Sequence, residues 1–164
     1  MLLQCRPLFM GEADRLPIDT ELDFSQVEYQ GECPFPVPVR VTGAVTARAG
    51  VVQLSARAVF EFHGHCDRCL TPFVHAYDIP LEHTLVTTLE NEDNDDYILL
   101  EQYRLDLDDL VMADILLELP YKSLCREDCR GLCPLCGKDL NEGLCGCNRQ
   151  SVDPRLEVLR QLLN

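Results

Sequence analysis

The residues with the most evident chemistry are ten cysteines, six of which lie within 23 residues near the C-terminal end. Two pairs, Cys66 with Cys69 and Cys133 with Cys136, have the Cys-x-x-Cys spacing that places two thiolates on one side of a metal ion. Gly137 follows the second pair directly and allows the sharp turn that aims backbone amides at the sulfur atoms. This pattern is typical of a zinc knuckle.

Eight cysteines stand at spacings suited to two tetrahedral zinc sites, since each such site takes four thiolates. We predict as ligands Cys66, Cys69, Cys125, Cys129, Cys133, Cys136, Cys145 and Cys147. In the preferred pairing the last four form a local site, and the first four tie the C-terminal tail to the earlier pair. The alternative joins the two Cys-x-x-Cys pairs as a zinc ribbon. Cys5 and Cys33 lack a partner at ligand spacing and are expected to be small buried apolar residues.

Other cysteine chemistry fits these spacings less well. Disulfides need an oxidising compartment, and the N-terminus has no apolar segment after a basic start that would direct export. The cysteine run also differs from the Cys-x2-Cys-x2-Cys-x3-Cys-Pro pattern of iron–sulfur proteins. Closed four-cysteine sites are structural as a rule, so zinc is expected to fold a tail that has little apolar material. A mixed site stays open, because His63 and His65 flank Cys66.

β-strands are expected to position these ligands. In the part of the sequence before the cysteine run, apolar and polar residues alternate with a period of two, which indicates strands. The clearest run covers residues 52–62, where Val, Leu, Ala and Phe alternate with polar or small residues. Cys66 and Cys69 then lie in the turn of an antiparallel hairpin, a rigid support for two ligands. Further strands are predicted at residues 18–24, 37–47 and 73–85.

Two helices are predicted. Asp106 caps the first, residues 105–119, which is apolar on nearly every side and should therefore pack across the sheet. Asp114 and Glu118 stand four residues apart on this helix and are a candidate contact for a partner. The second, shorter helix covers residues 153–163 and begins with an Asp-Pro pair.

Together these elements predict an α+β fold: an antiparallel sheet, open or closed into a barrel, with one packing helix, a zinc-knuckle segment and a short C-terminal helix. We expect an acidic, β-rich body over residues 1–120 and a zinc-stapled tail over residues 121–164. No apolar run approaches the roughly 18 residues of a membrane span. The protein is therefore expected to be soluble and cytoplasmic, without membrane contact.

Charge is divided unequally between these two parts. The net charge is −14, of which the tail carries +1 and the body −15. Residues 82–118 contain twelve acidic residues and one basic residue, Arg104. Such a body disfavours broad contact with phosphates. It is either a solvated surface that aids solubility or, if it has a binding function, a surface for a basic protein partner. Arg126, Arg130 and Lys138 in the tail offer a smaller contact to RNA.

Several of these motifs occur in the order found in the YceD family, also called DUF177, and the chain resembles the cysteine-rich, zinc-binding branch of that family. The resemblance runs from about residue 38 to the end and rests on Pro38-Val39 with Gly43, Cys66-Asp67-Arg68-Cys69-Leu70, Asp106-Leu107, Leu119-Pro120, the run from Cys125 to Cys147, and Asp153-Pro154-Arg155-Leu156. It implies a role in accumulation of the 23S RNA of the large ribosomal subunit, and it brings no catalytic residues.

The resulting hypothesis is a non-enzymatic factor in large-subunit biogenesis that holds two structural zinc ions. Its partner would be a ribosomal protein or a precursor particle of the large subunit. Two alternatives remain. One is a zinc-dependent hydrolase or nuclease acting on ribosomal RNA, which would need an open metal position and a water ligand. The other is a regulatory protein-binding adaptor unrelated to ribosomes.

Overall fold

The computed structural model describes residues 1–88 and 97–147. The acidic segment between the sheet and the first predicted helix lies mostly outside these residues, as does the predicted helix 153–163. Among the described residues, no helix is long and apolar enough to cross a membrane.

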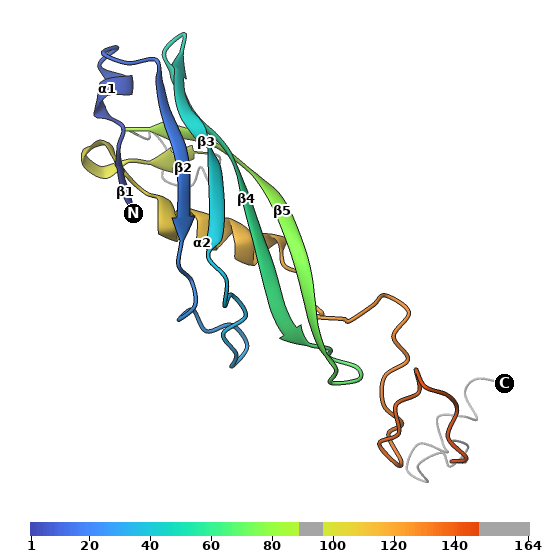
Figure 1. Ribbon diagram of the computed structural model, residues 1–164. Coiled ribbons are helices and arrows are strands. Elements are labelled where there is room, and N and C mark those ends of the chain that lie inside the picture. The colour runs from blue at the N-terminus through green and yellow to red at the C-terminus, as the bar shows by residue number, and fades with distance from the viewer. Residues whose placement is uncertain (89–96, 148–164) are drawn as a thin grey trace, which may run out of the picture.

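A five-stranded sheet forms the body of the protein (Figure 1). Its strand order is β2-β3-β4-β5-β6, with antiparallel pairing throughout except between β5 and β6, which are parallel. The strands are β2 (Arg15–Leu22), β3 (Val39–Arg48), β4 (Val51–His65), β5 (Pro72–Val86) and β6 (Tyr97–Leu99).

Strand β4 is the centre of the sheet and shows why the sequence folds in this way. Every second residue from Val52 to Phe62 is buried, and the intervening residues are exposed. Because successive side chains of a strand point to opposite faces, one face of β4 enters the core and the other meets solvent. Ala49 and Gly50, both with positive φ, make the tight turn that joins β3 to β4.

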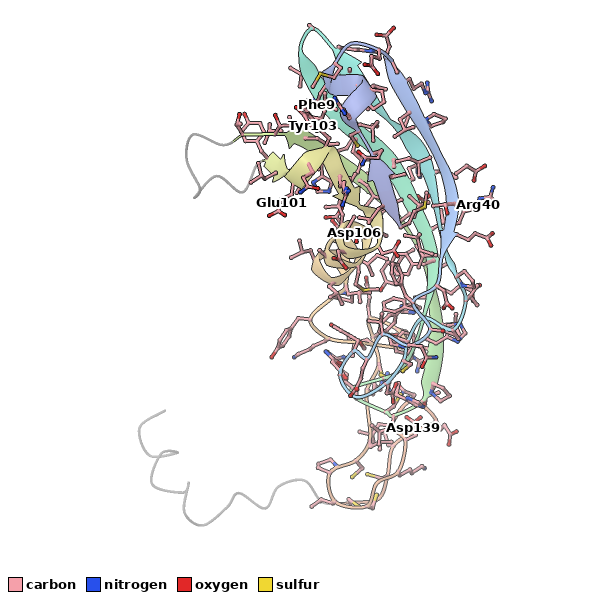
Figure 2. The ribbon with its side chains drawn as sticks, turned by 90° about the vertical axis from the view of Figure 1, so that its left-hand side faces the viewer. Phe9, Arg40, Glu101, Tyr103, Asp106 and Asp139 are labelled. Atoms are coloured by element: carbon pink, nitrogen blue, oxygen red, sulfur yellow. The ribbon has the colours of Figure 1, made fainter. Side chains whose placement is uncertain are left out.

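The remaining elements cover one face of the sheet. They are β1 (Leu2–Gln4), α1 (Arg6–Phe9), the 3-10 helix η1 (Glu101–Tyr103), β7 (Arg104–Asp106) and α2 (Leu107–Glu118), with β1 and β7 paired as a separate two-stranded sheet. Figure 2 shows α2 on one side of the sheet and Arg40 projecting from the other side. The core therefore lies between the sheet and α2.

Asp106 caps helix α2, as the sequence predicted. The Asp106 side chain accepts a hydrogen bond from the Asp108 backbone N–H at 3.2 Å. The helix starts two residues later than expected, because residues 104–106 pair with β1 before the helix can begin. Leu107, Val111 and Ile115 then bury one face of α2 against the sheet.

The structure has the mainly antiparallel sheet and the packing helix expected of an α+β fold, and it decides two details of the sheet. Among the described strands the sheet does not close into a barrel, because β2 and β6 stand at opposite ends of the strand order and do not pair with each other. It is also mixed, since β6 runs parallel to β5. The division into a body and a tail at residue 120 stays a prediction.

A polar contact links α2 to the sheet. His83 Nε2 on β5 lies 2.6 Å from Asp114 Oδ2, and the two side chains are only 22% and 16% exposed. Asp114 therefore faces the sheet, where a partner would not reach it easily. Of the two acidic residues predicted to contact a partner, only Glu118 is exposed.

We expect Asp114→Ala to lower the free energy of unfolding by about 2 kcal/mol, because the His83 N–H loses its acceptor in a partly buried place. Urea denaturation would measure this loss. Asp19→Ala is the matched control, since the Asp19–Arg40 ion pair is exposed and should contribute about 0.5 kcal/mol at most. Equal losses in the two variants would show that the His83 contact contributes no more than a surface ion pair.

Candidate metal centres

Four cysteines come together where the β4–β5 hairpin meets the tail. Cys66 and Cys69 lie in the hairpin turn, and Cys125 and Cys129 lie in the tail; we call this group site 1. Their four sulfur atoms all lie within 4.8 Å of one another. Cys66 Sγ is 3.7 Å from Cys129 Sγ, and Cys69 Sγ is 3.7 Å from Cys125 Sγ.

A second group of four cysteines lies entirely within the tail. Its sulfur atoms also lie within 4.8 Å of one another, and we call this group site 2; its members are Cys133, Cys136, Cys145 and Cys147. The membership of both groups is that of the preferred pairing and differs from a zinc ribbon. Metal binding at either group stays a prediction.

The sulfur spacing fits a single tetrahedral ion. Zinc–sulfur bonds of about 2.3 Å place the corners of a tetrahedron roughly 3.8 Å apart, close to the two 3.7 Å separations in site 1. A disulfide requires about 2.05 Å, and all ten cysteines have free thiols. Four sulfur atoms this close also leave no room for a cluster of several iron atoms.

The two Cys-x-x-Cys turns have the same backbone hydrogen bonds. In site 1, Leu70 N donates to Cys66 O at 2.8 Å; in site 2, Gly137 N donates to Cys133 O at 2.8 Å. The first cysteine of each turn also donates its N–H to the carbonyl five residues later, at 3.0 Å and 2.8 Å respectively. Leu70 and Gly137 occupy equivalent positions and are both left-handed, with φ values of 60° and 72°. The sequence pattern indicated the glycine turn only, because leucine rarely adopts this conformation.

Two residues between the ligands of the first turn hold the tail in place. Asp67 N donates to Ser123 O, and Ser123 N donates to Asp67 Oδ2, both at 2.8 Å. Arg68 Nη1 donates to Cys129 O at 2.7 Å, and Arg68 O accepts from Leu132 N at 3.0 Å. Sequence reasoning missed both roles, since the partners lie more than 50 residues away.

Gly131 permits this close approach. Its φ is +71°, and a Cβ at this position would lie 2.8 Å from the Arg68 backbone oxygen. The absence of a side chain therefore allows the tail to pass directly against the hairpin turn.

The electrostatics of site 1 favour a cation. Burial opposes ionisation of Cys66, but backbone N–H groups of Cys125, Arg68 and Cys69 donate to its sulfur and lower the pKa to about 6. Desolvation and the thiols of Cys69 and Cys66 raise the pKa of Cys125 to about 12. Four adjacent thiols therefore cannot all ionise near neutral pH unless a positive charge lies between them.

Site 2 likewise contains one thiol with a lowered pKa and one with a raised pKa. Backbone N–H groups of Leu135 and Cys136 lower the pKa of Cys133 to about 6. A hydrogen bond with Cys136, together with desolvation, raises the pKa of Cys147 to about 12. A dication would offset the free-energy cost of ionising four adjacent thiols, because it stabilises all four thiolates.

These pKa values predict how zinc affinity depends on pH. Cys125 and Cys147 keep their protons at pH 7–9 without metal, so each site must release at least one proton when zinc binds. Affinity at each site should rise at least about tenfold per pH unit in this range. Below pH 6, Cys66 and Cys133 also take up protons, and the dependence should become steeper. Competition titrations with a chelator of known proton affinity would measure it; a flat profile would contradict four-thiolate ligation.

Neither His63 nor His65, which flank Cys66, belongs to site 1 or site 2. His65 Nδ1 contacts Glu32 at 2.8 Å, and His63 Nε2 contacts Glu61 at 3.1 Å. Both therefore pair with carboxylates near the sheet surface. Cys5 is buried as expected, but the expectation for Cys33 was wrong, because this residue lies in an exposed loop.

The predicted basic contacts of the tail are partly engaged within the tail itself. Arg126 Nε lies 3.4 Å from Asp128 Oδ1. Lys138 Nζ donates to Leu144 O at 3.3 Å, beside site 2. The Arg130 side chain is exposed.

Fold and sites together define a small α+β protein whose C-terminal region carries two closed four-cysteine groups, one of them shared with a hairpin of the sheet. The family described as large ribosomal RNA subunit accumulation protein YceD matches residues 54–163, from strand β4 onward. This range includes all eight cysteines of sites 1 and 2. The chain therefore belongs to the YceD family.

Similar proteins occur in several bacteria. An uncharacterized protein of Mycobacterium tuberculosis is 32% identical over 104 residues, which cover 61% of this chain and 50% of that protein. An uncharacterized protein of Mycobacterium leprae is 35% identical over 102 residues, covering 62% and 43%. The uncharacterized protein YlbN of Bacillus subtilis is 28% identical over 128 residues, covering 77% and 74%. The chain spans about half the length of the mycobacterial relatives, and no solved structure matches it.

Proposed function

We propose that this protein holds two structural zinc ions and acts, without catalysis, in the accumulation of large-subunit ribosomal RNA by binding a basic ribosomal protein or a precursor particle. Membership of the YceD family supports the ribosomal role. The single observation that supports the binding of two structural zinc ions is the presence of two complete four-cysteine groups.

The zinc ions would act as cross-links. When bound, each ion joins four thiolates that the tail cannot hold together through apolar contacts alone. In site 1, Cys66, Cys69 and Cys129 are already buried beside partly buried Leu124 and Leu132. Binding there would fasten the tail to the hairpin.

A hydrolytic role is less well supported, because four sulfur ligands leave no position for a reactive water. Substitution with Co²⁺ tests this point directly. We expect the absorption spectrum of tetrahedral cobalt with four thiolates at both sites. A five-coordinate spectrum, or one that changes with added hydroxide, would favour the hydrolase instead.

The charge of the described tail supports a protein partner more than RNA. Residues 121–147 contain four basic and four acidic residues and are therefore neutral. Each zinc with four thiolates adds a charge of −2, so the tail together with the hairpin ligands of site 1 would carry about −4. Joined to a body of charge −15, it forms an acidic molecule suited to a cationic partner.

Sucrose-gradient sedimentation of tagged protein from a lysate, across a salt series, tests this proposal. We expect co-migration with incomplete large subunits, weakening as salt rises, and retention of a protein partner after nuclease treatment. Glu118→Lys should weaken this association, whereas Glu21→Lys, an exposed residue of β2 on the face of the sheet opposite α2, is the matched control. Migration only as a free small protein at low salt would contradict the ribosomal role.

A further inference from the structure

We propose that Asn141 couples the two metal centres, so that an ion in site 2 slows the loss of the ion from site 1. The proposal rests on zinc occupancy of both sites. Asn141 lies in the loop between Cys136 and Cys145, two ligands of site 2. Its side-chain amide nevertheless reaches site 1, where Nδ2 donates to Cys129 Sγ at 3.4 Å.

The other contacts of Asn141 fix its orientation. Its Oδ1 accepts from the Arg130 backbone N–H at 2.8 Å, so Nδ2 must face the other way. There the amide group donates to Cys129 Sγ and to Asp139 Oδ1, the latter at 2.7 Å. The Asn141 side chain thus contacts both the sulfur of Cys129 and the backbone of Arg130, the next residue along the chain.

The surrounding backbone links the same two sites. Cys129 of site 1 and Cys133 of site 2 stand four residues apart on one segment. The returning segment pairs with it: Leu132 and Asp139 form an antiparallel bridge, and Leu140 N donates to Gly131 O at 2.9 Å. The Cys136–Cys145 loop is closed by site 2, so the ion there would hold Asn141 in its donating position.

The amide has a definite effect on a metal-bound sulfur. An N–H donor stabilises the thiolate relative to the thiol and restricts the sulfur to one orientation. Removing groups that orient metal ligands costs about 10–100-fold in metal affinity in other proteins. Asn141 is therefore a positioning residue for site 1, although it lies in the loop of site 2.

The test uses the full chain loaded with ¹¹³Cd, which gives one NMR resonance for each site. Cys125→Ser and Cys145→Ser assign the resonances to sites 1 and 2, and transfer to a chelator measures metal release from each. We expect Asn141→Ala to shift the site 1 resonance and to speed release from site 1 about tenfold. The site 2 resonance should stay in place, which shows that the tail remains folded.

Further variants separate coupling from a local packing effect. Asn141→Asp keeps the acceptor for Arg130 but places a carboxylate against the sulfur, so it should speed release from site 1 at least as much as Asn141→Ala. Glu142→Gln, an exposed neighbour, should change nothing. Cys145→Ser should also speed release from site 1, and adding Asn141→Ala to it should have no additional effect, since the amide has already lost its position.

Two outcomes would overturn the coupling alone: wild-type release from site 1 in Asn141→Ala, or additive effects in the double variant. A wild-type protein that binds fewer than two ions would instead refute the two-site proposal, and the coupling with it.

Discussion

Cys66→Ser should reduce the zinc content from two ions to one and release the tail from the hairpin. Cys66 is fully buried, and its sulfur is one of four in site 1. Structural zinc contributes about 10–16 kcal/mol of binding free energy near neutral pH in small zinc-finger peptides, so losing one of four thiolates removes a large stabilising term. Site 2 should keep its ion, because its four ligands all lie within the tail.

Native mass spectrometry would give the stoichiometry, and limited trypsin digestion would report release of the tail through faster cleavage after Lys122 and Arg126. Cys33→Ser is the matched control, since Cys33 is exposed and belongs to neither site 1 nor site 2. Loss of an ion that leaves free thiols at Cys133 and Cys136 would support the zinc-ribbon pairing instead. Retention of two ions would remove Cys66 from the ligand set.

Gly43→Ala should prevent the sheet from forming normally. A Cβ at Gly43 would lie 2.4 Å from both Ala56 Cα and Ser55 O, which are backbone atoms of the neighbouring strand β4. Relief would require β3 and β4 to separate where their register places Gly43 opposite Ala56. We expect a loss of at least about 3 kcal/mol in the free energy of unfolding, at the upper end of the usual cost of overpacking.

Urea denaturation followed by circular dichroism would measure this loss. Gly50→Ala is the matched control: its new Cβ would meet nothing within 4 Å, and only its positive φ of 82° opposes the change. That variant should lose about 1 kcal/mol. A Gly43→Ala protein as stable as Gly50→Ala would show that the two strands can separate at little cost.

Much of the fold follows from local patterns in the sequence. The alternation from Val52 to Phe62 predicted strand β4, because one buried face of a sheet requires a period of two. The cap at Asp106 placed the start of α2 within two residues. Cysteine spacing likewise indicated two groups of four, since residues three apart in a tight turn face one point whatever surrounds them.

Only the tertiary structure decided how these parts meet. The parallel pairing of β6 with β5 and the strand order of the sheet join residues through tertiary contacts, which no local period encodes. Asp114 looked exposed by helical position, yet it faces His83 on a strand about 30 residues earlier. Its surroundings are a property of the packed helix and sheet.

The same division holds at the metal centres. The sequence by itself determined which cysteines are close enough along the chain to act in pairs. The tertiary structure decided that Asp67 and Arg68 hold the tail, that Leu70 adopts a turn suited to glycine, and that Asn141 reaches the sulfur of the other site. These contacts join residues that are distant along the chain or serve different sites, so their energies depend on the completed fold and leave no periodic signal in the sequence.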